Sequence, residues 1–210
     1  MNWTWISRNL GAIADAALDH VVLTVLAVGI GFAISFLFAI LIHRDRRFYS
    51  PISGLTGVLY TIPSLALFGL LVPITGLSLL TAEIGLISYT LLILTRHIVA
   101  GLDGVPPDID EAATGMGYDT RARLLRVDLP LAIPLIVAGL RVATVTTIGL
   151  VMVTALIGEG GLGQLMLRGF NFRNYTAVYV GAIVTVGLAV VADLALIVVG
   201  RLTTPWTRPR

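Results

Sequence analysis

The sequence contains no cysteine and no lysine, so all 14 basic residues are arginine. Without cysteine, the chain can form neither disulfide bonds nor thiolate metal sites. Without lysine, it cannot contain a P-loop, because the lysine of that motif binds the nucleotide phosphates. If ATP drives this protein, a separate subunit must bind it.

Charged residues are also scarce, because the 210 residues are 57% hydrophobic and only 12% charged. A soluble domain usually carries about 25% charged residues. The apolar surplus occurs in long runs, which indicates membrane helices rather than a large soluble core. The net charge of +2 is too small to indicate a nucleic-acid partner. The histidines, His20, His43 and His97, lack the spacing of a metal site.

Five apolar runs are candidates for membrane spans, since a helix needs about 20 apolar residues to cross the hydrocarbon core. The predicted spans are residues 21–42, 54–73, 77–95, 131–157 and 177–200. We therefore expect an all-α polytopic membrane protein with about five transmembrane helices. Pro63 in the second run predicts either a packing kink or a bend that lines a pathway. A sixth span, from splitting residues 131–157 or from the N-terminal helix, is an alternative.

The arginines predict the orientation, because cytoplasmic loops are enriched in basic residues. With five spans and an outer N-terminus, ten arginines are cytoplasmic, three are outside and Arg141 is unassigned. The ten cytoplasmic positions are Arg44, Arg46, Arg47, Arg96, Arg121, Arg123, Arg126, Arg201, Arg208 and Arg210. The resulting division is an amphipathic outer segment (1–19), a transmembrane domain (20–200) and a cytoplasmic tail (201–210).

The polar loop 101–130 carries the densest cluster of charge in the chain. Pro106 and Pro107 end the preceding helix and suit the first turn of a new one. Acidic residues occupy that turn, where they face the positive end of the helix dipole: Asp108, Asp110 and Glu111. Gly115 and Gly117 are suited to ending this helix. We expect a short helical unit joined closely to two membrane helices.

The second half of the loop predicts another short helix, capped by Asp119 or Thr120. Its arginines form either a solvated face or a contact with a partner protein and membrane lipid: Arg121, Arg123 and Arg126. In the first half, the small residues Ala112, Ala113 and Gly115 let a partner surface approach the backbone closely.

The loop resembles the EAA signature of ABC-importer permeases. EAATGMG at 111–117 supplies the Glu-Ala-Ala and the glycine six residues after the glutamate, and Val127 to Pro130 resembles the closing Ile-x-Leu-Pro, with valine for isoleucine. The resemblance implies the type I ABC importer permease fold. It also implies that this loop docks in a groove of the ATPase subunit and transmits closure of the nucleotide-bound dimer to the pore. The residues implied in coupling are Glu111, Ala112, Ala113, Gly115, Gly117, Leu129 and Pro130.

Four further stretches are similar to the permeases of osmoprotectant importers: 60–76, 129–145, 157–169 and 191–196. This resemblance implies a bacterial plasma-membrane protein that transports glycine betaine, carnitine, choline or proline betaine. The implied partners are a dimer of ABC ATPase subunits, a second permease copy or paralogue, and an extracytoplasmic solute-binding protein. ATP and magnesium would belong to the ATPase, and this chain would hold no cofactor.

A few polar residues within the predicted spans are candidates for the pathway: Tyr60, Ser64, Tyr89 and Thr144. Aromatic rings can contact a quaternary ammonium group through cation–π interactions, although aromatic residues in spans more often serve packing. Asp193 lies within the last span, where an acidic residue is either functional or paired. We expect a structural ion pair with Arg141 or Arg96.

Three other functions remain as alternatives at this point. An importer of an amino acid such as methionine would share the same loop. A stand-alone channel or an ion-coupled carrier would not require so elaborate a loop. An intramembrane enzyme would require paired acids, a Ser–His pair or a metal site, and the sequence shows none of these arrangements. We therefore assign no catalytic residue.

Overall fold

A computed structural model describes residues 1–207, so Arg208 and Arg210 of the predicted tail lie outside the described residues. All regular structure in residues 1–207 is helical. The α-helices are α1 (Trp3–Arg8), α2 (Leu10–Arg44), α3 (Tyr49–Thr61), α4 (Ser64–Thr75), α5 (Leu79–Asp103), α6 (Pro107–Gly115), α7 (Thr120–Arg123), α8 (Leu129–Thr154), α9 (Gly161–Asn171) and α10 (Tyr175–Thr203). Short 3₁₀ helices cover Arg46–Phe48, Ala155–Ile157 and Pro205–Thr207, and a π-helix covers Leu124–Asp128.

Four helical segments are long and apolar enough to cross a membrane: α2, α5, α10 and the continuous segment Thr120–Ile157, which contains α8. A fifth is present if the bent pair α3–α4 counts as one span. A helix rises 1.5 Å per residue, so apolar runs of this length are long enough to cross the hydrocarbon core. The predicted all-α architecture with about five spans is confirmed.

The predicted second span, residues 54–73, is not the single kinked helix that the sequence suggested. α3 ends at Thr61 and α4 begins at Ser64, and the two helices are bent by 98°. Pro63 lacks an amide hydrogen and disfavours a helical conformation at the preceding residue. Ile62 accordingly has an extended backbone with ψ of 126°. With 13 residues, α3 extends about 20 Å, which is too short to cross the membrane alone.

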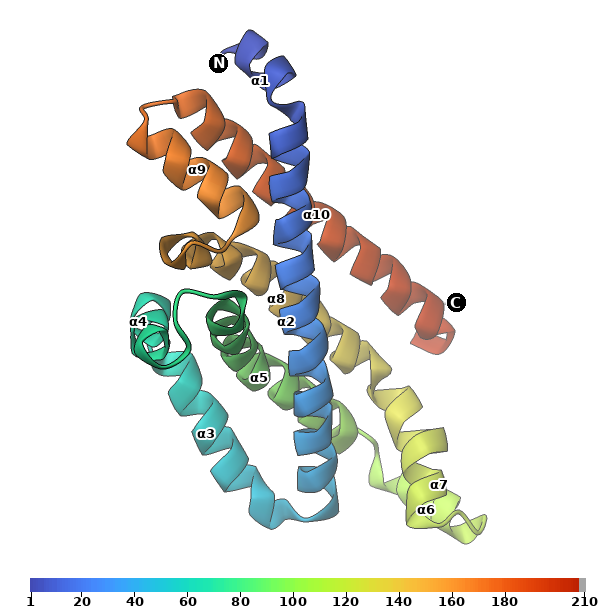
Figure 1. Ribbon diagram of the computed structural model, residues 1–210. Helices are drawn as coiled ribbons and strands as arrows, with labels where there is room; N and C mark the ends of the chain where they lie inside the picture. Colours follow the sequence, from blue (N-terminus) through green and yellow to red (C-terminus); the bar gives the residue numbers. More distant parts are fainter. Residues whose placement is uncertain (208–210) are drawn as a thin grey trace.

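The longest helix, α2, extends through most of the length of the molecule (Figure 1). It begins at Leu10 and passes the predicted boundary at residues 19–20 without a break. Its 35 residues correspond to about 52 Å, more than the thickness of the hydrocarbon core. The backbone amide of Asn2, before α1, donates to Thr176 Oγ1 at 3.0 Å and so ties the N-terminus to the start of α10.

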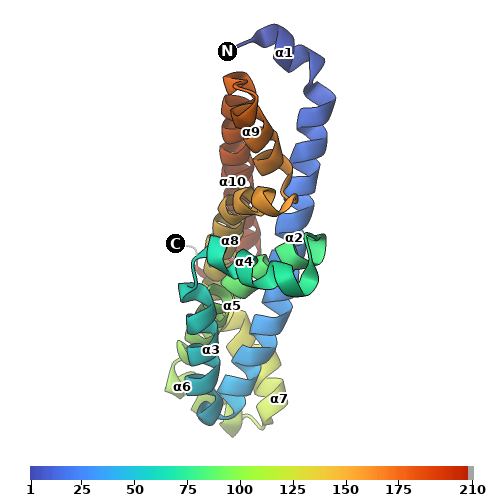
Figure 2. The same cartoon turned by 60° about the vertical axis from the view of Figure 1, so that its left-hand side comes forward.

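The molecule has two distinct ends (Figures 1 and 2). α1, α9 and the start of α10 lie at one end, which we call the N-terminal end. α6, α7, the end of α2 and the start of α3 lie at the other, which we call the loop end. Figure 2 shows α4 lying across the bundle between the two ends.

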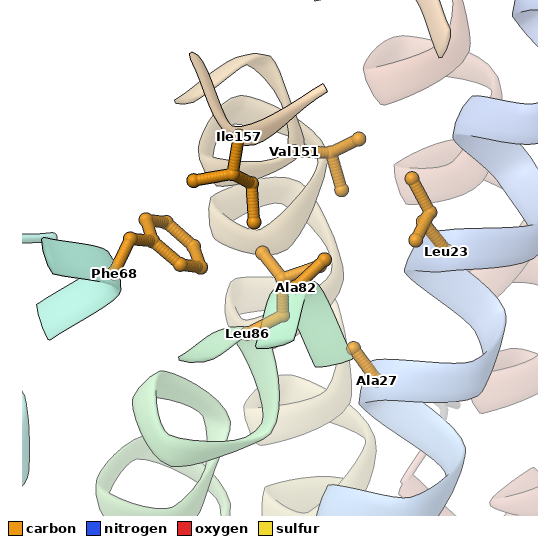
Figure 3. Close-up of a cluster of buried hydrophobic side chains, with 7 residues drawn as sticks. All are labelled: Leu23, Ala27, Phe68, Ala82, Leu86, Val151 and Ile157. Atoms are coloured by element: carbon orange, nitrogen blue, oxygen red, sulfur yellow. The ribbon is translucent and has the colours of Figure 1, made fainter. Parts of the chain in front are cut away.

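The core is formed mainly by α2, α5 and α8, with α4 closing one side. One buried cluster comprises Leu23, Ala27, Phe68, Ala82, Leu86, Val151 and Ile157. In Figure 3, Phe68 points from α4 toward Ile157 and Ala82. A second cluster nearer the loop end comprises Ala39, Ile42, Ile98, Val99, Leu102, Ala132 and Ile136. Small residues bring these helices close, since a Cβ at Gly31 of α2 would overlap the side chain of Thr90 of α5.

Ion pairs fix the turn between α2 and α3. Asp45 caps this turn by accepting a hydrogen bond from the backbone amide of Arg47 at 3.0 Å. The side chain of Arg47 also donates to Asp45 and holds the pKa of that carboxyl below its usual value. Arg46 donates to both carboxylate oxygens of Asp103 at the end of α5, one of them at 2.8 Å. The start of α3 is thereby joined to the end of α5.

Candidate functional site

The loop after α5 forms the predicted short helix, α6. Pro106 is its N-cap residue and Pro107 its first helical residue, as the fixed backbone angle of proline favours. Asp108 and Asp110 lie in the first turn, where their charge stabilises the helix dipole. Glu111 follows and is exposed to solvent.

Gly117 ends this helix in a Schellman motif. Its φ of 85° places it in the left-handed region, which glycine adopts without the steric cost of a Cβ. The amide of Gly117 donates to Thr114 O at 3.0 Å, and the amide of Tyr118 donates to Ala113 O at 3.1 Å. The glycine six residues after Glu111 therefore has a backbone role that explains its identity from within this chain.

The second half of the loop leads without interruption into α8. Asp119 caps α7 by accepting a hydrogen bond from the amide of Ala122 at 2.7 Å. α7 passes through the π-helix Leu124–Asp128 into α8, whose first residues are Leu129 and Pro130. The loop is therefore joined to a membrane helix by continuous helical structure.

One strip of α6 is exposed, and two of its three residues are small. Ala113 is only 1% exposed and faces the protein, whereas Glu111, Ala112 and Gly115 face solvent. A Cβ built at Gly115 would meet no described atom within 4 Å. Internal packing therefore does not require a residue without a side chain at position 115. Ala112 and Gly115 are both small, so another protein can approach the helix closely at these positions.

A buried acidic residue at the base of the loop escaped the sequence reasoning. Asp128 is 1% exposed, and its Oδ2 lies 3.6 Å from Nε2 of His43 and 3.8 Å from Nε of Arg123. Arg123 Nε also lies 3.7 Å from Asp110 Oδ1 on α6. This cluster joins α6, α7, the π-helix before α8 and the end of α2. The sequence signal that could have revealed this cluster was the presence of His43 and Asp128 at the ends of two neighbouring spans.

Three of the four candidate pathway residues gather where α3 and α4 break. The rings of Tyr60 and Tyr89 pack edge to face with their centres 5.8 Å apart. The hydroxyl of Tyr89 donates to the carbonyl oxygen of Ile62, so it satisfies a backbone group that the break leaves free. Ser64 follows as the first residue of α4 and is half-buried.

Thr144 does not belong to this group. It lies on α8 and lines a separate cavity of about 230 Å³ together with His20 of α2 and Leu188 of α10. The sequence placed it with the tyrosines only because it is a polar residue in an apolar run. Its helix neighbours, not its polarity, decide which cavity it faces.

Arg141 and Asp193 form a two-pronged ion pair between α8 and α10. Nε of Arg141 donates to Oδ1 of Asp193 at 2.7 Å, and a terminal nitrogen of the guanidinium donates to Oδ2 at 2.9 Å. Of the two expected partners of Asp193, the structure brings Arg141 to it. Charge-assisted hydrogen bonds of this geometry are among the strong ones in proteins. They fasten α10 to the core helices.

Within residues 1–207, no group of three or more histidine and acidic side chains could hold a metal ion. The features that stand out are instead a solvent-exposed helical loop and polar groups inside a helical bundle. These features suit the binding of a partner protein and the passage of a solute.

Comparisons with known proteins agree with this picture. Residues 21–204 match the family of binding-protein-dependent transport system inner membrane components. The chain is 37% identical to the osmoprotectant import permease protein OsmW of Salmonella typhimurium over 90% of both chains. It is 36% identical to the glycine betaine/carnitine/choline transport system permease protein OpuCD of Bacillus subtilis, over 92% of this chain and 85% of that protein.

A solved structure of the MetNI methionine ABC transporter, in an inward-facing conformation, has a similar chain. It superposes with a TM-score of 0.83 at 20% sequence identity and covers 94% of this chain and 98% of that one. This likeness shows the fold, which is that of type I ABC importer permeases and confirms the expectation from the loop signature. The chain belongs to the family of inner membrane components of binding-protein-dependent transport systems.

Proposed function

We propose that this chain is the permease subunit of an ATP-driven importer of osmoprotectants such as glycine betaine, carnitine, choline or proline betaine. A dimer of separate ABC ATPase subunits binds ATP and magnesium and docks on the loop 101–130. A second permease copy or a paralogue completes the pore, and an extracytoplasmic solute-binding protein delivers the solute. The chain itself performs no catalytic step.

The observation that carries the proposal is the exposed strip of α6, in which position 115 is glycine although internal packing does not require it. The strip coincides with the signature residues Glu111, Ala112 and Gly115. α6 is linked through Asp110, Arg123 and the buried carboxylate of Asp128 to the spans. A partner that moves α6 would therefore move α8 and the end of α2 as well.

Substrate class is proposed from the relatives, whose names state osmoprotectant, glycine betaine, carnitine or choline transport. Tyr60 and Tyr89 support this choice, since an aromatic pair can contact a quaternary ammonium group. In the proposed orientation, the N-terminus is outside and the loop end is cytoplasmic. The excess of arginine at the loop end supports this orientation.

The decisive experiment measures ATP-dependent uptake of glycine betaine in vesicles that hold the complete transporter with its binding protein. Gly115→Leu should lower both uptake and solute-stimulated ATP hydrolysis at least about tenfold, because steric overlap at a protein interface readily costs about 1.4 kcal/mol. Gly11→Leu is the matched control, since a Cβ at Gly11 also meets no described atom within 4 Å. Full coupling in the Gly115→Leu variant would refute the docking role of the strip.

A separate experiment tests the orientation. Because the sequence contains no cysteine, any label on this chain must be on the introduced thiol. Thr120→Cys and Asn9→Cys each introduce a single thiol, one at the loop end and one near the N-terminus. A membrane-impermeant maleimide added to intact cells should label the Asn9→Cys variant and spare the Thr120→Cys variant. Labelling of the Thr120→Cys variant alone would invert the orientation and would remove the loop from the cytoplasmic ATPase.

The amino-acid importer is the second candidate function, and the fold likeness to the MetNI methionine ABC transporter favours it. Competition separates the two candidates in the same vesicles. Excess unlabelled choline and carnitine should reduce glycine betaine uptake, whereas excess methionine should not. Uptake of methionine, with no effect of the quaternary ammonium compounds, would establish the second candidate instead. Solute flux by this chain alone without ATP would indicate a stand-alone channel or carrier.

A further inference from the structure

A cavity of about 660 Å³ that is lined by several polar side chains lies between α3 and α5 near the loop end. α3 and α5 run side by side there, as Figure 1 shows. α3 contributes Tyr49, Ser53 and Thr56, which fall on one face because they are spaced four and three residues apart. α5 contributes Thr95 and Arg96, and the ion pair of Arg46 with Asp103 lies at the edge. The functions considered so far use none of these groups.

Arg96 supplies an uncompensated positive charge to this cavity. Within residues 1–207 its guanidinium makes no hydrogen bond or ion pair. The other arginine of the cavity, Arg46, is already neutralised because it donates to both oxygens of Asp103. One positive charge therefore remains, on the α5 side of the cavity. Arg96 is exposed, so its guanidinium is accessible to a ligand in this space.

The hydroxyl of Thr95 gives a second, independent indication of a ligand. Thr95 is 2% exposed and lines the cavity, yet its Oγ1 has no hydrogen-bond partner among the described residues. Other hydroxyls of α5 are satisfied by their own helix. Ser88 donates to Ile84 O at 2.7 Å, and Thr90 donates to Ile87 O at 2.8 Å. A buried hydroxyl that leaves its hydrogen bond unmade loses stabilising free energy unless something else accepts it.

A guanidinium and a hydroxyl that line the same cavity, both without a partner in the described residues, can together bind an oxyanion. Ser53 and Tyr49 place two more hydroxyl groups on the opposite wall. The cavity lies near the ends of α3 and α5, close to the turn that carries Arg44, Arg46 and Arg47. Basic pockets between membrane helices at the cytoplasmic surface are suited to anionic lipid headgroups.

We propose that the cavity between α3 and α5 is an oxyanion-binding site in which Arg96 is the charged ligand and Thr95 donates a hydrogen bond. The phosphate of an anionic phospholipid and a small soluble oxyanion share the chemistry that these groups recognise. The site does not depend on the identity of the transported solute. Its test therefore measures binding to the purified full-length chain, and its outcome is separate from that of any transport assay.

The first experiment measures binding of phosphatidylglycerol and of phosphatidylcholine with the same acyl chains, by native mass spectrometry of the detergent-solubilised chain. Arg96→Gln should weaken phosphatidylglycerol binding about tenfold, because a charge-assisted contact of this kind is worth more than 1.4 kcal/mol. Thr95→Val should weaken it less, since the charge remains. Arg47→Gln is the matched control, because Arg47 is a neighbouring arginine with a 90% exposed side chain that does not line the cavity.

The second experiment measures the unfolding temperature of the same variants with inorganic phosphate or acetate at constant ionic strength. Phosphatidylglycerol binding that depends on Arg96, with weak phosphatidylcholine binding, supports a lipid headgroup as the occupant. Stabilisation by phosphate or acetate that depends on Arg96, without a lipid effect, supports a soluble oxyanion in the same site. If neither phosphatidylglycerol nor the soluble oxyanions distinguish Arg96→Gln from Arg47→Gln, the proposal is overturned.

Discussion

The helices α5 and α10 have similar lengths, 25 and 29 residues, and opposite surroundings. In the most apolar window of α5, 67% of the residues are buried inside the protein, whereas in α10 none are. Yet α10 is the more apolar helix of the two. Of these two helices, the more apolar one therefore faces outward, and the one at the centre is the less apolar.

The difference has a physical cause in what each helix touches. Lipid chains are as apolar as leucine, so an apolar side chain gains little by leaving lipid for protein, and helices associate through close packing and hydrogen bonds. α5 follows this rule with small and hydroxyl-bearing residues such as Gly85, Ser88 and Thr90. α10 instead presents an outer face of branched apolar residues, including Ile183, Val186, Val190, Val191 and Leu194. That face suits lipid or a second copy of the chain.

The largest difference between α5 and α10 is expected when one apolar side chain in each helix is truncated to alanine. Leu94→Ala in α5 removes a side chain that is 0% exposed, whereas Val190→Ala in α10 removes one that is 52% exposed. We expect Leu94→Ala to lower the free energy of unfolding by about 2 kcal/mol, the low end for a buried leucine, because only packing is lost in lipid. We expect almost no change for Val190→Ala. Equilibrium unfolding in mixed micelles measures both, and equal losses would break the comparison.

A bulky residue in place of glycine should have the next largest effect. A Cβ at Gly31 of α2 would overlap Thr90 of α5, whereas a Cβ at Gly187 of α10 would meet nothing within 4 Å. Gly31→Val should therefore destabilise the fold by about 1–3 kcal/mol through overpacking. Gly187→Val serves as the control and should leave the unfolding temperature unchanged. If the two variants behaved alike, α2 and α5 could not be as closely packed as described.

Disruption of the ion pair between Arg141 and Asp193 should have a smaller effect on stability. This change tests how α10 is held against α8. Arg141→Leu leaves the carboxylate of Asp193 without its partner within the membrane, so the unfolding temperature should fall. The double variant Arg141→Leu with Asp193→Leu leaves no unpaired charge and should regain most of the loss. Thermal unfolding of the two variants in parallel is the measurement. A double variant no more stable than the single one would argue against a structural role for the pair.

The smallest expected effect distinguishes two hydroxyls on the same helix. Thr90→Val removes a hydroxyl that donates to Ile87 O at 2.8 Å, so stability should fall by about 1 kcal/mol. Thr95→Val removes a buried hydroxyl without a partner in the described residues and should leave stability in detergent unchanged or slightly higher. Both variants keep the shape of the side chain. A clear loss in Thr95→Val would show that this hydroxyl has a bonding partner even in detergent.

The spans and the loop were predictable from the sequence, for reasons of local chemistry. Long apolar runs mark membrane helices because the bilayer sets their length. Pro107 at the start of α6, Gly117 at its end and Asp119 at the cap of α7 each have roles that their backbone or side chain determines locally. Asp193 was expected to pair because an intramembrane acid has few partners available.

Other features depend on contacts between helices that are distant in the sequence, and local sequence patterns do not reveal such contacts. The presence of Pro63 predicted a kink. Whether the chain bends slightly or by 98° depends on the helices against which α4 packs. Thr144 faces a cavity away from Tyr60 because the packing of α2 and α10 against α8 decides its surroundings. The buried position of Asp128 likewise results from α2 and α6 converging on it.

The uninterrupted helix from Thr120 to Ile157 has a mechanical consequence. Its 38 residues form one continuous helical shaft, which includes a π-helix and a final 3₁₀ turn, with the capped turn of α7 at one tip and the core residue Ile157 near the other. A shaft of this kind has no flexible linker at the membrane boundary in which a sideways push could be lost. A tilt imposed at the Asp119 tip would swing the opposite tip, so one end of the molecule can be opened or shut by leverage from the other.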